Sequence, residues 1–108
     1  MEMVYRFKIK PGKAGEFVQW TKWFEETLPE PPPGWKYLST YFVTHGFGEY
    51  DAEIRWQVED YAALGSGPGS EEGQAANREF VSKFVDDRFP MKTTLMKSVD
   101  DIFVPDGF

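Results

Sequence analysis

The sequence lacks cysteine and contains a single histidine. Without cysteine, disulfides, thiolate zinc sites, iron–sulfur clusters and cysteine nucleophiles are excluded. Basic residues are few: 12 lysines and arginines against 18 aspartates and glutamates give a net charge of −6, which disfavours binding to a nucleic-acid backbone. There is no apolar run of about 18 residues, and the first residues lack a basic stretch followed by an apolar one. We therefore expect no membrane segment and a cytoplasmic protein.

Aromatic side chains are abundant instead. They occupy 18% of the 108 positions, and 41% of positions are hydrophobic. This composition is typical of a compact globular protein, and its length predicts one domain covering residues 1–108. Small domains with many large aromatic side chains often bury some of them against a partner.

Four segments have the pattern of β-strands. Residues 3–9 alternate between apolar and polar side chains, residues 35–44 are rich in aromatic and β-branched side chains, and residues 51–59 alternate again. Residues 91–99 are strand-like with poorer alternation. Two glycines within residues 45–50 favour a hairpin between the second and third strands.

Two segments have the pattern of amphipathic helices. Apolar side chains recur every three or four positions over residues 13–28 and again over residues 71–87, where Ser70 is a candidate N-cap. Proline and glycine at residues 29–34 end the first helix, and a glycine-rich loop at residues 65–70 precedes the second. The helical spacing of the aromatic residues indicates packing on a sheet rather than a flavin or porphyrin site.

The order strand, helix, strand, strand, helix, strand predicts an α+β fold: a ferredoxin-like βαββαβ sandwich, with a four-stranded antiparallel sheet and both helices on one face. Alternation nevertheless puts large side chains on both faces of the second strand: Trp35, Tyr37 and Tyr41 on one, and Leu38 and Phe42 on the other. We therefore expect a second copy to cover the open sheet face, so that a homodimer encloses an α/β barrel.

The order of residues also resembles a known family. Residues 4–13 read Val-Tyr-Arg-Phe-Lys-Ile-Lys-Pro-Gly-Lys, and a helix starts near residues 15–17. This segment resembles the first strand and helix of dimeric α/β-barrel proteins, a superfamily that includes NIPSNAP-like and antibiotic-biosynthesis-monooxygenase-like groups. Residues 48–64 are similar to the third strand and the helix start that follows it in that superfamily. These motifs encode turns, alternation and capping, so they support a fold rather than an activity.

The resemblance implies a cofactor-independent reaction: oxygenation, isomerisation or decarboxylation of a polyketide-like or related metabolite. Haem-degrading members of the superfamily carry an iron-binding histidine on the second helix, and residues 71–87 contain none. The glycines at residues 65–69 form no phosphate-binding motif. We therefore expect no cofactor.

Strand pairing predicts a polar cluster on the sheet. If the third strand lies beside the first, Glu53 and Arg55 share a face with Arg6 and Lys8. The two cations, with aromatic walls, would hold an anionic or oxygen-rich aromatic ligand. The alternative is a set of cross-strand ion pairs on a solvated or dimer-buried surface. The candidate ligand-binding residues are Arg6, Lys8, Trp35, Tyr37, Glu53 and Arg55.

Two residues are candidates for catalysis. His45 is the only side chain whose ordinary pKa lies near neutrality, so it is the natural group for proton transfer, and Tyr41 would donate a hydrogen bond. A histidine between strands and beside a glycine is also consistent with an ordinary exposed loop residue. A metal site is not expected, because the single histidine has no HxH or HExxH partner.

Two functions remain open from the sequence. The first is a small homodimer that binds a small oxygenated or aromatic metabolite in the cleft between sheet and helices, acting as a cofactor-independent monooxygenase or isomerase. The second is a non-enzymatic accessory or metabolite-binding dimer. The expected partners are a second copy and a small molecule, with no nucleic acid and no membrane.

Overall fold

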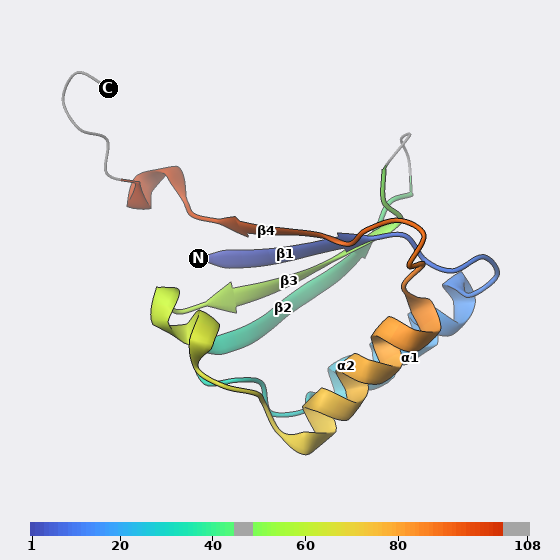
Figure 1. Ribbon diagram of the computed structural model, residues 1–108, viewed down its shortest axis with the longest axis horizontal. Coiled ribbons are helices and arrows are strands. Elements are labelled where there is room, and N and C mark those ends of the chain that lie inside the picture. Colours follow the sequence, from blue (N-terminus) through green and yellow to red (C-terminus); the bar gives the residue numbers. More distant parts are fainter. Residues whose placement is uncertain (45–48, 103–108) are drawn as a thin grey trace.

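The computed structural model describes residues 1–44 and 49–102. The elements run, in chain order, β1 (Glu2–Phe7), α1 (Ala14–Thr27), β2 (Trp35–Phe42), β3 (Ala52–Val58), the 3₁₀ turn η1 (Tyr61–Gly65), α2 (Glu71–Phe84), β4 (Lys92–Met96) and the 3₁₀ turn η2 (Val99–Asp101) (Figure 1). The predicted order of four strands and two helices is confirmed.

The four strands form one antiparallel sheet in the order β2-β3-β1-β4. Both helices lie on the same side of this sheet (Figure 1). The molecule is thus an α+β sandwich with the strand order of a ferredoxin-like fold. The pairing puts β3 beside β1, as the sequence predicted, with Arg6 opposite Glu53.

The predicted second helix is three residues too long. Helix α2 begins after Ser70, whose side chain accepts a hydrogen bond from the backbone N–H of Gly73 at 3.1 Å, as a cap should. It ends at Phe84, because Val85 is extended and pairs with Ile9 in an isolated β-bridge. The next backbone N–H, of Asp86, donates to the carbonyl of Lys8 at 2.8 Å.

A bulge in β2 changes the predicted faces of that strand. Tyr37 pairs with Trp56, but the next pair joins Ser39 to Arg55, so Leu38 has no partner in the register. The extra residue reverses the alternation beyond it. Phe42 therefore turns to the helices, where its ring lies 5.5 Å from that of Phe17, and Tyr41 turns to the open face of the sheet. The predicted faces of these two residues are exchanged.

The core lies at the end of the sandwich where α1 begins and α2 ends. Phe7 from β1 contacts Phe17 of α1 and Phe80 of α2 through edge-to-face rings, with centroid distances of 5.6 and 4.9 Å. Phe84 contacts Phe17 in the same way at 5.5 Å. All four rings are buried. Aromatic pairs with this geometry stabilise a core by about 0.5–1.5 kcal/mol beyond the area they bury.

Candidate functional site

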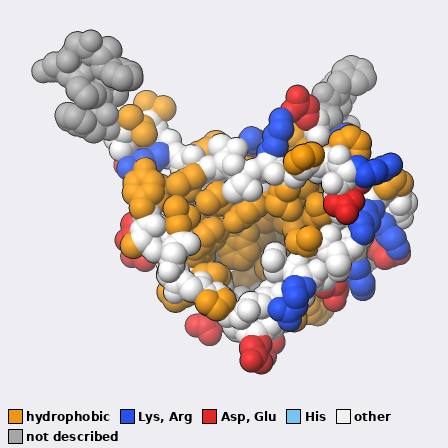
Figure 2. All heavy atoms as spheres, viewed as in Figure 1, with side chains coloured by type: hydrophobic (Ala, Val, Ile, Leu, Met, Phe, Trp, Pro, Cys, Tyr) orange, Lys and Arg blue, Asp and Glu red, His pale blue; other side chains and the backbone are white. Residues whose placement is uncertain are grey.

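Away from this core, the sheet and the helices diverge and leave an apolar cleft. Figure 2 shows a hollow lined by hydrophobic side chains in the middle of the molecular face that is turned to the viewer. The cleft has a volume of about 490 Å³ and lies between the sheet, both helices and the loops that join them. Small-molecule sites in proteins have volumes of roughly 300–1,000 Å³ and mostly apolar walls.

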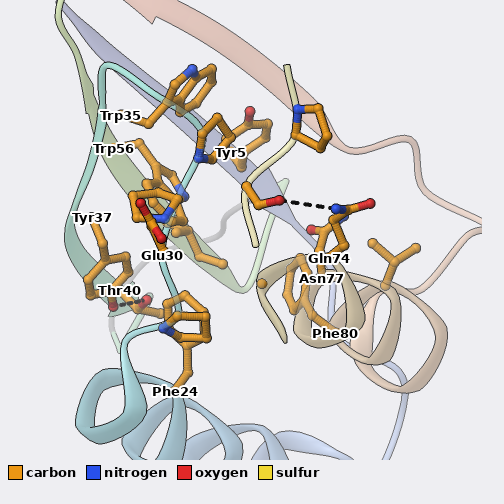
Figure 3. A pocket seen from close by; sticks show the side chains of 18 of the residues that line it. Tyr5, Phe24, Glu30, Trp35, Tyr37, Thr40, Trp56, Gln74, Asn77 and Phe80 are labelled. Carbon is orange, nitrogen blue, oxygen red and sulfur yellow. Dashed lines mark hydrogen bonds between the residues drawn. The ribbon is translucent and has the colours of Figure 1, made fainter. Parts of the chain in front are cut away.

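The sheet supplies an aromatic wall to the cleft. Alternation and strand pairing place Tyr5, Trp35, Tyr37 and Trp56 on the helix-facing side, and all four line the cleft (Figure 3). The Trp56 ring lies 5.4 Å from Tyr37 and 6.2 Å from Trp35, each nearly perpendicular to it. The indole N–H of Trp35 donates to the carbonyl of Ala63 at 2.8 Å, which orients that ring.

Two loops in close contact form one end of the cleft. The backbone N–H of Ser70 donates to the carbonyl of Glu30 at 2.9 Å. A Cβ on Gly69 would lie 2.6 Å from that same carbonyl oxygen, so only glycine fits without moving the backbone. The proline-rich segment that ends α1 is thereby held against the segment that leads into α2.

Helix α2 supplies polar groups opposite the aromatic wall. Gln74 and Asn77 lie one turn apart and line the cleft together with Phe80 (Figure 3). The side-chain amide of Gln74 donates to the carbonyl of Gly69 at 3.1 Å, which leaves its oxygen able to accept. Asn77 is exposed, and its amide can both donate and accept.

The two tyrosines of the cleft are hydrogen-bond donors at neutral pH. Burial raises the pKa of Tyr5 above its ordinary value. Burial also raises the pKa of Tyr37, and Glu25 adds to the rise while the hydrogen bond with Thr40 opposes it. The Tyr37 hydroxyl lies 2.8 Å from a Glu25 carboxylate oxygen and 2.6 Å from the hydroxyl of Thr40. Both phenols are therefore neutral at neutral pH and are not bases there.

The charged residues predicted for the site lie on the other face of the sheet. One carboxylate, Glu53, accepts from Nε of Arg6 at 3.1 Å and from Nε of Arg55 at 2.8 Å. Burial acts to raise the pKa of Glu53, but the hydrogen bonds from Arg55 and Arg6 outweigh it and hold the pKa below its ordinary value. Glu2 extends the network through Arg55 at 3.8 Å. These contacts match the ion-pair alternative considered from the sequence.

The structure thus does not bring the predicted site residues together. Trp35 and Tyr37 line the cleft, while Arg6, Glu53 and Arg55 pair on the opposite face.

The other candidates lie elsewhere. Lys8 follows β1 and pairs with Asp51 at 3.8 Å. Tyr41 sits opposite Glu53 in the sheet register, and 56% of its surface is exposed. His45 falls outside the described residues. The catalytic roles assigned to Tyr41 and His45 stay predictions.

Several cleft residues were missed from the sequence: Tyr5, Glu30, Trp56, Gln74 and Asn77. A signal for four of them was present. Tyr5 alternates in phase with Phe7, Trp56 alternates in phase with Ala52 and Ile54, and Gln74 precedes Asn77 by one turn on the helix face that carries Phe80. Polar residues within an apolar helix face indicate a surface that is not closed by packing alone.

Comparisons with known proteins found no match to the chain among family models, curated proteins or solved structures. The resemblance to dimeric α/β-barrel proteins therefore stays a prediction. Among the residues that the structure describes, no helix is long and apolar enough to cross a membrane, and no three His, Cys, Asp or Glu side chains are grouped as a metal ion requires.

Proposed function

We propose that this protein binds a small oxygenated or aromatic molecule in the cleft between its sheet and its helices. The observation that carries the proposal is the wall of four aromatic side chains on the sheet. It faces two side-chain amides on α2 across a cleft with a volume of about 490 Å³. Aromatic walls favour a ligand with apolar or aromatic groups through burial and ring contacts, and a few polar groups fix its orientation.

Recognition is the role that the described groups of the cleft serve best. Tyr5 stays protonated and can donate, and the amides of Gln74 and Asn77 can donate or accept, so an oxygenated molecule would meet polar partners on both sides of the cleft. The Tyr37 hydroxyl already donates its one proton to Glu25. The cofactor-independent oxygenation or isomerisation implied by the family resemblance would be a further step on such a ligand. The proposed function is binding of the ligand without a chemical reaction.

Three of the four tryptophans provide an internal test. In ¹H–¹⁵N spectra, titration with the neutral probe 2-naphthol should shift the indole N–H signals of Trp35 and Trp56, which line the cleft. Trp23 lies outside it and is 45% exposed, so its signal should not move. Equal shifts of all these signals would indicate nonspecific contact and would contradict a cleft site.

A pair of variants on α2 sharpens this test. Asn77→Phe places a ring in the cleft from an exposed position and should weaken 2-naphthol binding about tenfold or more, because it occupies the space of the ligand. Arg78→Phe adds the same ring at the next exposed position, which does not line the cleft. Similar affinities of the two variants would overturn the proposed site.

We further propose that a second copy covers the open face of the sheet. This face presents both signs of charge in one network, with Arg6 and Arg55 around Glu53, and such a network is self-complementary about a twofold axis. Exposed Tyr41 beside it would be buried. Light scattering at micromolar concentration should give a mass near twice 12.5 kDa, and a monomeric mass would overturn the dimer.

A further inference from the structure

Neighbouring rings in the aromatic wall of the cleft stand nearly perpendicular to one another. Trp56 stands at its centre, and the rings of Trp35, Tyr37 and Phe24 meet it at interplanar angles of 72°, 76° and 69°. Trp35, Tyr37, Phe24 and Trp56 are all half-buried, so each has surface left for a ligand. Rings set nearly at right angles surround a rounded group better than a flat one. The face of an aromatic ring is its electron-rich side and attracts cations.

The charge within the cleft lining is negative. Among the described residues that line it, Glu30 is the only one with a full charge, and Glu25 accepts a hydrogen bond from the Tyr37 hydroxyl beside it. Two arginines of the sheet, Arg6 and Arg55, point to the opposite face and are paired with Glu53 there. Carboxylates at the mouth of an apolar cleft concentrate a negative potential within it.

We propose that the ligand class of this cleft is a small organic ammonium ion. This inference rests on the proposed function and narrows it. The ammonium group lies among the perpendicular rings of Trp35, Tyr37 and Trp56, and the carboxylate of Glu30 balances its charge from the edge of the cleft (Figure 3). The amides of Gln74 and Asn77 bind the polar end of the same molecule from α2.

The decisive experiment compares two molecules of the same shape. Choline carries a trimethylammonium group, and 3,3-dimethylbutan-1-ol replaces its nitrogen with carbon. Titrations of both at one ionic strength, followed by the indole N–H signals of Trp35 and Trp56, should give an affinity about tenfold higher for choline. The signal of Trp23 is the reference, because that residue lies outside the cleft.

Charge variants test the carboxylate separately. Glu30→Gln should lower the affinity for choline about two- to fivefold, because an ion pair at an exposed site is lost. The affinity for the alcohol should stay unchanged, because the alcohol carries no charge. Glu26→Gln removes the same charge from an exposed residue outside the cleft and should alter neither affinity. Equal effects of the two substitutions on choline binding would overturn the role of Glu30.

The outcomes separate the two proposals. Equal binding of choline and its neutral analogue, or cleft shifts with 2-naphthol and none with choline, would overturn the ammonium ligand while the proposed function stands. Absence of cleft shifts with all three probes would overturn both. A choline preference that is weakened by Glu30→Gln and not by Glu26→Gln would support both.

Discussion

The two ends of the sandwich use the same kind of residue to opposite effect. At the end where α1 begins, Phe7, Phe17 and Phe84 pack against one another and none exposes more than 2% of its surface. At the other end, Trp35 and Trp56 pack along the sheet, but the helices cover them only in part, and they line a cleft. Hydrophobicity alone therefore does not determine which aromatic side chains become core.

The connections between elements explain the difference. At the closed end, six residues join β1 to α1 and seven join α2 to β4. The two connections are tied together by hydrogen bonds from Lys10 N–H to the Phe84 carbonyl at 2.9 Å and from Asp86 N–H to the Lys8 carbonyl at 2.8 Å. At the open end, a proline-rich segment and the 3₁₀ turn η1 stand between helices and strands and hold the helix ends away from the sheet (Figure 1).

The largest expected effect on the free energy of unfolding comes from a substitution at the closed end. Phe17→Ala removes a fully buried ring that contacts Phe7, Phe80 and Phe84, and should lower the free energy of unfolding by about 3–5 kcal/mol. Trp56→Ala removes a larger side chain that is half-exposed to the cleft, so its cost should be about 1.5–3 kcal/mol. Denaturant unfolding followed by circular dichroism measures both.

The comparison between the ends would fail if the two costs were equal, or if Trp56→Ala were the more destabilising. Either result would mean that the open end is packed as tightly in solution as the closed one. A smaller cost for Trp56→Ala, with loss of 2-naphthol binding, would confirm that the ring serves the cleft more than the core.

A smaller effect on stability is expected where the loop before α2 contacts the proline-rich segment after α1. Gly69→Ala would place a Cβ 2.6 Å from the Glu30 carbonyl oxygen and 3.0 Å from the carbonyl carbon of Pro31, so the loops must separate. The expected cost is about 1–3 kcal/mol. Gly65→Ala is the matched control, since its Cβ would meet nothing within 4 Å. Thermal unfolding of the two variants tests this contact, and equal melting temperatures would contradict it.

The order and type of the elements could be predicted because they depend on local patterns. Period-two alternation in β1 and β3 and the apolar faces of both helices need only neighbouring residues to be recognised. The end of α2 could not be predicted, because it depends on the pairing of Val85 with Ile9, which lies 76 positions earlier in the chain. The helical periodicity continues past that point without a signal.

The site was less predictable, and one residue accounts for much of the difference. Simple alternation along β2 puts Tyr41 with Trp35 and Tyr37, but the bulge at Leu38 moves Tyr41 to the opposite face. No glycine or proline within β2 marks that bulge. Trp35 and Tyr37 were combined with the ion-paired face for another reason: alternation along β2 does not say which of its two faces meets the helices.

The smallest effect concerns a hydroxyl at the open end. Tyr37→Phe keeps the ring that contacts Trp56 but removes the hydrogen bonds with Glu25 at 2.8 Å and Thr40 at 2.6 Å. The expected loss of unfolding free energy is about 0.5–1.5 kcal/mol at neutral pH. Tyr61→Phe is the control, because Tyr61 is 64% exposed, and it should change stability less.

The pH dependence of that loss distinguishes the buried hydroxyl from a merely packed ring. Burial raises the pKa of Tyr37 in the folded protein above the value of about 10 for an unfolded tyrosine, so the unfolded chain loses its proton first. The stability that the neutral phenol contributes is thus complete below about pH 10 and falls as the pH rises beyond it. The stability difference between the natural protein and Tyr37→Phe should shrink over that range in urea unfolding. A difference that stays constant through it would show that the Tyr37 hydroxyl is solvated, and that the cleft is open to water as far as Thr40.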